Sequence, residues 1–268
     1  MLDKYNLDKK IIVITGGAGL LAEQHALAVL EKLGTPILID IDKKKLKKLE
    51  NRFKKDGHEV YTFVGDITNF KIMRNIKKKI VKKFKKIDVL VNNAQIDYVP
   101  KKKFKKNKIN NLFEKYSLKK WETEIDVGLK GAMICSQIFV IDMIKNKEGV
   151  ILNVASDLSV IAPDQRIYSH LNSIKPVTYS VIKHGLVGFT KYLASYLAEK
   201  NIRVNAISPG GVFNKQDKNF VKKIKKLIPL NRMAKVDEYK AAIQFLCSDA
   251  SSYMTGQNLI IDGGRSII

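Results

Sequence analysis

Short, fully apolar runs alternate along this chain with longer segments in which apolar residues recur at helical spacing. Such runs are typical of the buried strands of a parallel sheet, and the segments between them are typical of helices that cover it. The runs that predict strands are residues 11–14, 36–41, 58–64, 87–91, 150–154, 203–207 and 258–261. We therefore expect an α/β fold: a single domain over residues 1–268, with a doubly wound parallel sheet of seven strands and helices on both faces.

Four segments between these strands have distinct patterns. Residues 121–143 form a long stretch with one apolar face, and residues 97–118 are a lysine- and asparagine-rich excursion that leads into a helix. Residues 212–230 are polar and lysine-rich, which suggests a mobile lid. Residues 236–248 predict a helix with acidic residues in its first turn, where negative charges interact favourably with the helix dipole.

The net charge of +23 raises the possibility of a nucleic-acid partner. Only six of the 49 basic residues are arginine, whereas a surface that reads phosphates or bases would be expected to use the bidentate arginine fork more often. The lysines are spread over many predicted helices as solvated faces. We therefore expect no nucleic-acid partner, although the basic surface could attract anionic small molecules.

The N-terminus is charged and lacks the apolar core of a signal peptide. Apolar runs are far shorter than the ~20 residues that a membrane helix needs, so we expect a cytoplasmic protein with no membrane partner. Cys135 and Cys247 lie in apolar helical patterns and are expected to be reduced core residues. Four scattered histidines and the absence of a Cys-x-x-C pair predict no metal site.

A glycine-rich turn follows the first predicted strand and opens a helix. This strand–turn–helix order is the context that a dinucleotide-binding motif requires, because the glycines let the main chain approach a pyrophosphate at the helix N-terminus. The residues of this turn that we expect to contact a cofactor are Gly16, Gly17, Gly19, Leu20 and Leu21. A tight turn without any ligand is the structural alternative.

Asp40 ends the second predicted strand, about 20 residues after the turn, where a carboxylate can accept hydrogen bonds from the ribose hydroxyls of NAD. The same carboxylate would repel the 2′-phosphate of NADP. A helix N-cap is the alternative role, for which Asp42 is the better candidate. NAD is therefore the expected cofactor, and the lysines at 43–45 leave NADP open.

Tyr179 and Lys183 are four residues apart in a segment with helical spacing, so both side chains lie on one face. An ammonium beside a phenol favours the phenolate and lowers the pKa of the tyrosine towards neutrality. A tyrosine tuned in this way can exchange a proton with an alcohol or carbonyl oxygen. The pair alone occurs by chance on many surface helices, so its weight comes from the rest of the chain.

Six motifs occur in one order along the chain, and together they resemble the short-chain dehydrogenase/reductase family over essentially its whole length. They are the turn at Thr15, Asp66-Ile67, Asn92-Asn93-Ala94, Ser156, Tyr179-x-x-x-Lys183 and Pro209-Gly210. The resemblance implies a Rossmann-like NAD(P)-dependent oxidoreductase that interconverts a secondary alcohol and a ketone. It also implies dimers or tetramers, built through the helices at 121–143 and 179–200.

The same resemblance implies a role for each matched residue. Tyr179 would be the catalytic acid/base, Lys183 would lower its pKa and bind the nicotinamide ribose, and Ser156 would polarise the substrate oxygen. The remaining matches would all contact the cofactor: Asp66, Ile67, Asn93, Ala94, Pro209, Gly210 and Val212.

Several positions depart from the family pattern. Leu20 and Ala22 replace glycines and could crowd the pyrophosphate, and Gln95 replaces the glycine of Asn-Asn-Ala-Gly. Gly128 takes the place of a catalytic asparagine, where a glycine still permits a helix kink and a water could fill the gap. These departures motivate the alternative of a dinucleotide-binding regulatory protein with impaired turnover.

Ser156 and Tyr179 are 23 residues apart, about ten more than is usual in the family, and we place the insertion at residues 161–178. Its polar side chains predict a pocket wall suited to a polyhydroxylated or anionic substrate: Asp164, Gln165, Arg166, Tyr168, His170 and Asn172. A solvated loop is the alternative. The insertion with its flanking sequence resembles a subgroup linked to flagellin and surface-polysaccharide modification, which implies a sugar derivative as substrate.

Overall fold

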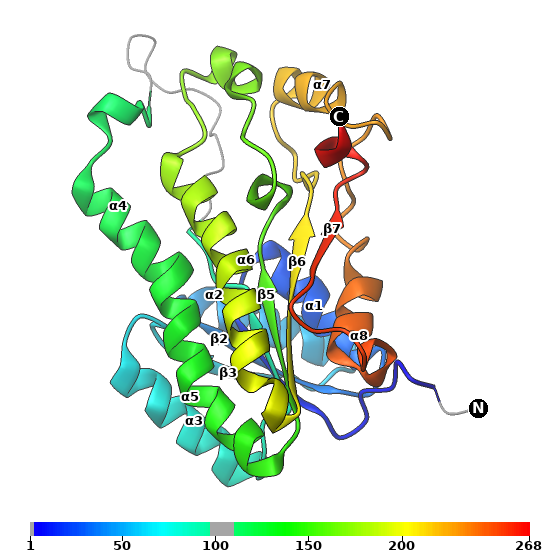
Figure 1. Cartoon of the computed structure of the whole chain (residues 1–268). Helices are drawn as coiled ribbons and strands as arrows, with labels where there is room; N and C mark the ends of the chain where they lie inside the picture. The colour runs from blue at the N-terminus through cyan, green and yellow to red at the C-terminus, as the bar shows by residue number, and fades with distance from the viewer. Residues whose placement is uncertain (1–2, 97–109) are drawn as a thin grey trace.

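Seven parallel strands form one sheet in the order β3-β2-β1-β4-β5-β6-β7, in a computed structural model that describes residues 3–96 and 110–268 (Figure 1). The predicted α/β class and strand number are therefore confirmed. The order reverses between β1 and β4, and ligands bind beside such switch points in open α/β sheets. The strands are β1 (Ile11–Thr15), β2 (Thr35–Asp40), β3 (Tyr61–Val64), β4 (Val89–Asn92), β5 (Gly149–Val154), β6 (Ile202–Pro209) and β7 (Asn258–Ile261).

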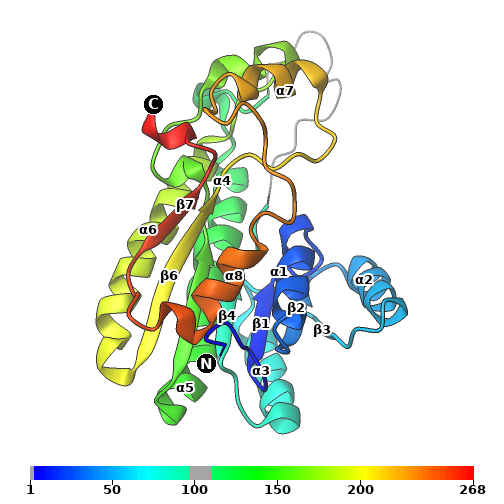
Figure 2. The same cartoon turned by 90° about the vertical axis from the view of Figure 1, so that its right-hand side faces the viewer.

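Helices cover both faces of this sheet (Figures 1 and 2). Alternate residues of β1 supply the two cores, because successive side chains of a strand point to opposite faces: Ile12 and Ile14 pack under α1, α2 and α8, whereas Ile11 and Val13 pack under α3, α5 and α6. The first layer contains α1 (Leu20–Leu30), α2 (Lys43–Lys55) and α8 (Lys240–Cys247); the second contains α3 (Phe70–Phe84), α5 (Gly131–Asn146) and α6 (Val177–Leu197).

Local capping explains where several helices begin. Asp42 caps α2 by accepting a hydrogen bond from the Lys45 N–H (3.0 Å), as its sequence position predicts. The acidic first turn expected for the helix at 236–248 is wrong, because α8 starts only at Lys240. Glu238 precedes that helix and instead forms an ion pair with Arg232 (2.6 Å).

The long apolar segment is one continuous helix in three parts: α4 (Leu118–Ile125), a π-helical stretch η2 (Asp126–Lys130) and α5. Gly128 lies in the π-helical stretch, and a Cβ built on it would lie 2.6 Å from Cγ2 of Ile182 on α6. A water could have filled the space left by the missing side chain. Instead, Ile182 occupies the space that a side chain at position 128 would take. Close packing of α6 against η2 is the physical reason for the glycine.

The stretch Leu118–Asn146 is long and apolar enough to cross a membrane, judged by length and composition, which unbroken apolar runs did not reveal. Half of its apolar window is buried inside the fold, and α5 packs against β4, β5 and α3. This is how the core helix of a soluble protein behaves. Cys135 on α5 and Cys247 on α8 are both buried and free, as predicted.

Candidate active site

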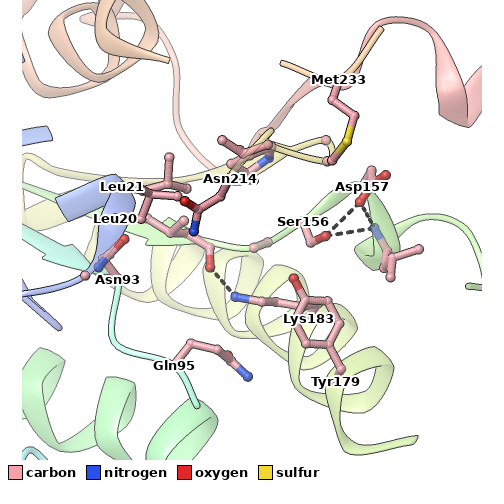
Figure 3. Close-up of a pocket in the computed structure, with 18 of the residues that line it drawn as sticks. Leu20, Leu21, Asn93, Gln95, Ser156, Asp157, Tyr179, Lys183, Asn214 and Met233 are labelled. Atoms are coloured by element: carbon pink, nitrogen blue, oxygen red, sulfur yellow. Dashed lines mark hydrogen bonds between the residues drawn. The ribbon is translucent and has the colours of Figure 1, made fainter. Parts of the chain in front are cut away.

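The carboxyl ends of the strands surround a cavity of about 480 Å³, within the size range of small-molecule sites. Leu20, Leu21 and Asn93 lie on one side of it, and Ser156 and Tyr179 lie on the other (Figure 3). The cavity therefore spans the distance between the predicted cofactor turn and the predicted catalytic residues. We call these two sides the cofactor end and the substrate end.

The glycine turn has its shape because side chains do not fit there. Gly16 has φ +63°, and a Cβ on it would lie 2.7 Å from Cα of Ala94. A Cβ on Gly17 would lie 2.7 Å from Cβ of Leu38. At Gly19 the nearest atom is the Gly16 carbonyl oxygen at 3.1 Å, so this glycine leaves the cavity open in front of the N-terminus of α1. The turn is thus fixed by packing on one side and is accessible on the other.

Asn93 holds the turn in place by its side-chain amide, which donates to the carbonyl oxygens of Thr15 (3.0 Å) and Gly16 (3.3 Å). The Thr15 hydroxyl in turn accepts from the N–H groups of Asn93 and Ala94. Asn93 also lines the cavity, whereas Ala94 is behind it against Gly16. The contact of Ala94 with a cofactor stays a prediction.

Asp40 lines the cavity at the end of β2, and its two carboxylate oxygens accept from the N–H groups of Ala18 (3.0 Å) and Asp42 (2.9 Å). These bonds fix the carboxylate between the glycine turn and the start of α2. Each carboxylate oxygen can accept a second hydrogen bond, as from a ribose hydroxyl. Lys45 also lines the cavity, and its ammonium pairs with Asp42 (3.4 Å).

The other expected cofactor residues are divided by the structure. Pro209, Gly210 and Val212 line the cavity after β6. Asp66 and Ile67 lie outside its lining: Asp66 accepts hydrogen bonds from the main chain and hydroxyl of Thr68, and Ile67 is buried in the core. Contacts of these two residues with a cofactor stay a prediction.

Tyr179, Lys183 and Ser156 converge at the substrate end (Figure 3). Lys183 is buried, donates to the Val154 carbonyl oxygen (2.8 Å), and its Nζ lies 5.6 Å from the centre of the Tyr179 ring. Tyr179 comes from the first turn of α6, and Ser156 lies two residues after the end of β5. The structure therefore brings together the three residues predicted to be catalytic.

Ser156 is oriented by a buried ionic pair. Its hydroxyl donates to Asp157 Oδ1 (2.8 Å), and Asp157 Oδ2 accepts from the guanidinium of Arg265 (2.8 Å). Asp157 and Arg265 have side chains only 4% and 7% exposed. The Ser156 oxygen also accepts from the Leu158 N–H (3.2 Å) and lines the cavity, so it has one further lone pair with which to accept from an alcohol. To donate to a ketone, the hydroxyl must rotate away from Asp157.

The polar wall predicted from the insertion is largely wrong. Of the six side chains proposed, only Tyr168 lines the cavity. Asp164 pairs with Arg166, and His170 contacts Asp217. The 3-10 helix η4 (Gln165–Leu171) buries its apolar side chains against α7 (Lys218–Lys225), with the ring centres of Tyr168 and Phe220 5.4 Å apart. Helical spacing in the insertion sends the polar residues outward because this apolar cluster takes the inner face.

The family departures have different consequences. Ala22 is fully buried in the core and does not reach the cavity, so the expected crowding at this position is absent. Leu20 lines the cavity and is 42% exposed. Gln95 also lines it, and its side-chain oxygen is buried with no hydrogen-bond partner within residues 3–96 and 110–268, so a polar ligand group could satisfy it.

Sequence reasoning missed further charged and polar groups of the cavity wall that come from separate parts of the chain: Asp157, Lys175, Asn214, Gln216 and Arg265. The Asp157 neighbour of Ser156 was a visible signal, since a charged residue shortly after a buried strand needs a partner. Nothing in the local sequence indicated Arg265 as that partner. Within residues 3–96 and 110–268, no cluster of His, Cys, Asp or Glu could hold a metal ion.

The family model described as Enoyl-(Acyl carrier protein) reductase matches residues 19–266. The chain is 33% identical to the 3-oxoacyl-(acyl-carrier-protein) reductase of Thermotoga maritima, over 97% of this chain and 99% of the relative. It is 30% identical to the post-translational flagellin modification protein A of Campylobacter coli, over 96% and 98% of the two chains.

Among solved structures, a short-chain dehydrogenase from Leptospira borgpetersenii with bound NAD+ superposes with a TM-score of 0.85. It is 31% identical, and the match covers 99% of this chain and 97% of that one. The fold, the family model and the relatives agree with the motifs and with the cavity described above. The chain belongs to the short-chain dehydrogenase/reductase family and is an NAD(P)-dependent oxidoreductase.

Proposed function

We propose that this protein uses NAD(H) to interconvert a secondary alcohol and a ketone on a polyhydroxylated or anionic sugar derivative. The observation that carries the proposal is the convergence of Ser156, Tyr179 and Lys183 on a cavity that also reaches the glycine turn and Asp40. A nicotinamide bound there would supply or accept the hydride. The cradle fits a dinucleotide, because Gly19 leaves space before α1 and Asp40 offers carboxylate oxygens.

The proton chemistry is assigned to this chain's own groups. Tyr179 exchanges the proton of the substrate oxygen, and Lys183 favours the tyrosine's ionised form. In the oxidative direction, Ser156 accepts a hydrogen bond from the alcohol while its own hydroxyl proton points to Asp157. This arrangement orients the alcohol before its proton leaves, and Arg265 pairs with Asp157 beside it.

The substrate class is inferred from the charge and polarity of the cavity lining. Lys175 and Arg265 are cations in this lining, and Asn214, Gln216 and Gln95 add amide groups. Such a lining can bind hydroxyl and carboxylate groups, whereas an acyl chain would leave these polar groups without partners. The likeness to the Campylobacter coli protein supports a role in flagellin or surface-glycan modification.

The first test is titration of the purified protein with NADH and with NADPH, followed by fluorescence, in parallel with Asp40→Ala. We expect NADH to bind more tightly than NADPH. Asp40→Ala should lower this preference at least tenfold, because a hydrogen bond to a charged group contributes ~1.5–3 kcal/mol. Binding of neither cofactor would overturn the proposal. Tighter binding of NADPH would retain the oxidoreductase and reject Asp40 as the ribose ligand.

The second test is a screen of keto-sugars for NADH oxidation, with Tyr179→Phe as the matched control. Loss of a general acid/base lowers turnover by about 10²–10⁴-fold, while the phenylalanine ring keeps the packing of the pocket. Cofactor binding without turnover of any ketone would instead support the impaired regulatory protein. That alternative is motivated by Gly128, since no side chain at this position reaches the site and Ile182 packs against it.

Assembly and location remain predictions. We expect a homodimer or homotetramer through α5 and α6, on which Ile141, Tyr192 and Tyr196 are exposed. Sedimentation of the purified protein would test this expectation, as would fractionation of cells for the expected cytoplasmic location. Movement of residues 212–230 as a lid is likewise proposed, supported by Val212, Asn214 and Phe220 in the cavity wall.

A further inference from the structure

A second lysine lies against the proposed proton-transfer group. The Nζ atom of Lys175 is 3.5 Å from the centre of the Tyr179 ring, whereas that of Lys183 is 5.6 Å away. Lys175 is only 9% exposed, and it belongs to the insertion rather than to α6. The cation on the face of the ring is therefore closer to the ring than the family's own lysine.

The main chain around Lys175 is held on both sides. The Gln165 side chain accepts from the Lys175 N–H (2.8 Å) and donates to the Lys175 carbonyl oxygen (3.2 Å). Asn111 donates to the carbonyl oxygen of Ile174 (3.1 Å). Pro176 follows directly as the N-cap residue of α6. With its main chain held in this way, Lys175 has only side-chain freedom to lose when its ammonium takes its place over the ring.

We propose that Lys175, held by Gln165, acts through Tyr179 as a second cation that favours the ionised form of the phenol. The negative charge of a phenolate spreads into the ring, so a cation over the ring face attracts it more strongly than it attracts the neutral phenol. The insertion thereby contributes to proton transfer, and does more than bound the pocket. The inference deepens the proposed function and rests on the role that it gives to Tyr179.

Among the described residues, the elements packed against Tyr179 carry other charged groups. Lys183 on α6 acts in the same direction as Lys175. Asp157 opposes both, but its charge is paired with Arg265. On α4, the buried carboxylate of Glu124 accepts from Thr178 and from Tyr116, and a lysine lies 3.7 Å from it. The change in the Tyr179 midpoint when Lys175 alone is replaced therefore measures the share of Lys175 beside that of Lys183.

The test is a spectroscopic pH titration that needs no substrate. The ultraviolet absorbance of tyrosinate is recorded against pH for the chain and for Tyr179→Phe, and their difference isolates one of the ten tyrosines. The same difference is then recorded in the Lys175→Met background. We expect the midpoint of Tyr179 to rise by about one pH unit, a tenfold fall in its acid dissociation constant, from a desolvated cation–ring contact.

Two further variants separate charge from structure. Lys175→Arg keeps the charge, so the midpoint of Tyr179 should stay close to that of the unmodified chain. Gln165→Leu removes the side chain that holds the Lys175 main chain, and it should raise the midpoint by less than Lys175→Met does. An unchanged midpoint in Lys175→Met, with native circular dichroism, would overturn the inference. So would an equal rise in Lys175→Arg and Lys175→Met. Because NADH binding and keto-sugar turnover are measured separately, failure of the proposed function would leave this titration interpretable.

Discussion

The cofactor end and the substrate end of the cavity are built by different means. The cofactor end is shaped by main chain and by close packing: Gly16 and Gly17 exist because a Cβ would meet Ala94 and Leu38. The substrate end is shaped by paired side chains from distant segments, above all Asp157 with Arg265. Added atoms should therefore disturb the cofactor end most, whereas removed charges should disturb the substrate end most.

The largest effect on stability is expected when the buried pair at the substrate end is broken. Arg265→Met leaves the Asp157 carboxylate buried without its partner, which costs about 3–5 kcal/mol of unfolding free energy. The double variant Arg265→Met/Asp157→Leu should recover much of this loss, because both charges are gone. Urea denaturation of the unmodified chain, of Arg265→Met, of Asp157→Leu and of the double variant measures these changes in unfolding free energy. Equal stability of the single and double variants would show that the pair does not hold the substrate end.

Helix α1, which begins at the cofactor end, carries the buried His25, and neither of its ring nitrogens has a hydrogen-bond partner among the described residues. Burial lowers the pKa of His25 from 6.5 to about 4. Above pH 6.5 both folded and unfolded chains hold it neutral and its full contribution to stability is present. Between pH 6.5 and 4 only the unfolded chain takes up the proton, so the unfolding free energy falls as the pH falls.

The shift corresponds to about 3 kcal/mol lost between pH 6.5 and 4. Urea denaturation at a series of pH values should therefore show a shallower acid dependence in His25→Leu than in the unmodified chain. Carboxylates whose pKa is lowered, such as that of Glu238 (from 4.5 to about 2), lose their contribution mainly between those two values, and this loss is common to both proteins. Parallel curves for the two proteins would reject His25 as the source of the acid sensitivity.

The smallest effect is expected from single methyl groups in the glycine turn. Gly17→Ala forces its new Cβ against Leu38 and should lower the unfolding free energy by about 1–3 kcal/mol. Gly19→Ala is the matched control, because its Cβ meets only the Gly16 carbonyl oxygen. It should change stability little and weaken NADH binding instead. Denaturation and cofactor titration of both variants would contradict the comparison if the two substitutions behaved alike.

Much of the fold was readable from the chain because each strand is a local, fully apolar run. The glycine turn, Asp40 and the Tyr179–Lys183 pair were likewise visible, since each is a short motif at fixed spacing. The acidic residues at 237–238 were misassigned to a helix because a helix start depends on local contacts: Glu238 accepts from the Lys235 N–H and pairs with Arg232. Helical periodicity alone does not locate that boundary.

The sequence by itself determined the sheet, the family and the three residues predicted to be catalytic, because those signals lie in local patterns and spacings. Only the tertiary structure decided what surrounds them. Arg265 reaches Asp157 across 108 residues of chain, and Lys175 reaches the Tyr179 ring because Gln165 and the start of α6 fix it there. The polar residues of the insertion turned outward for the same reason: the cluster of Tyr168 and Phe220 takes the inner face, and long-range packing carries no local signature.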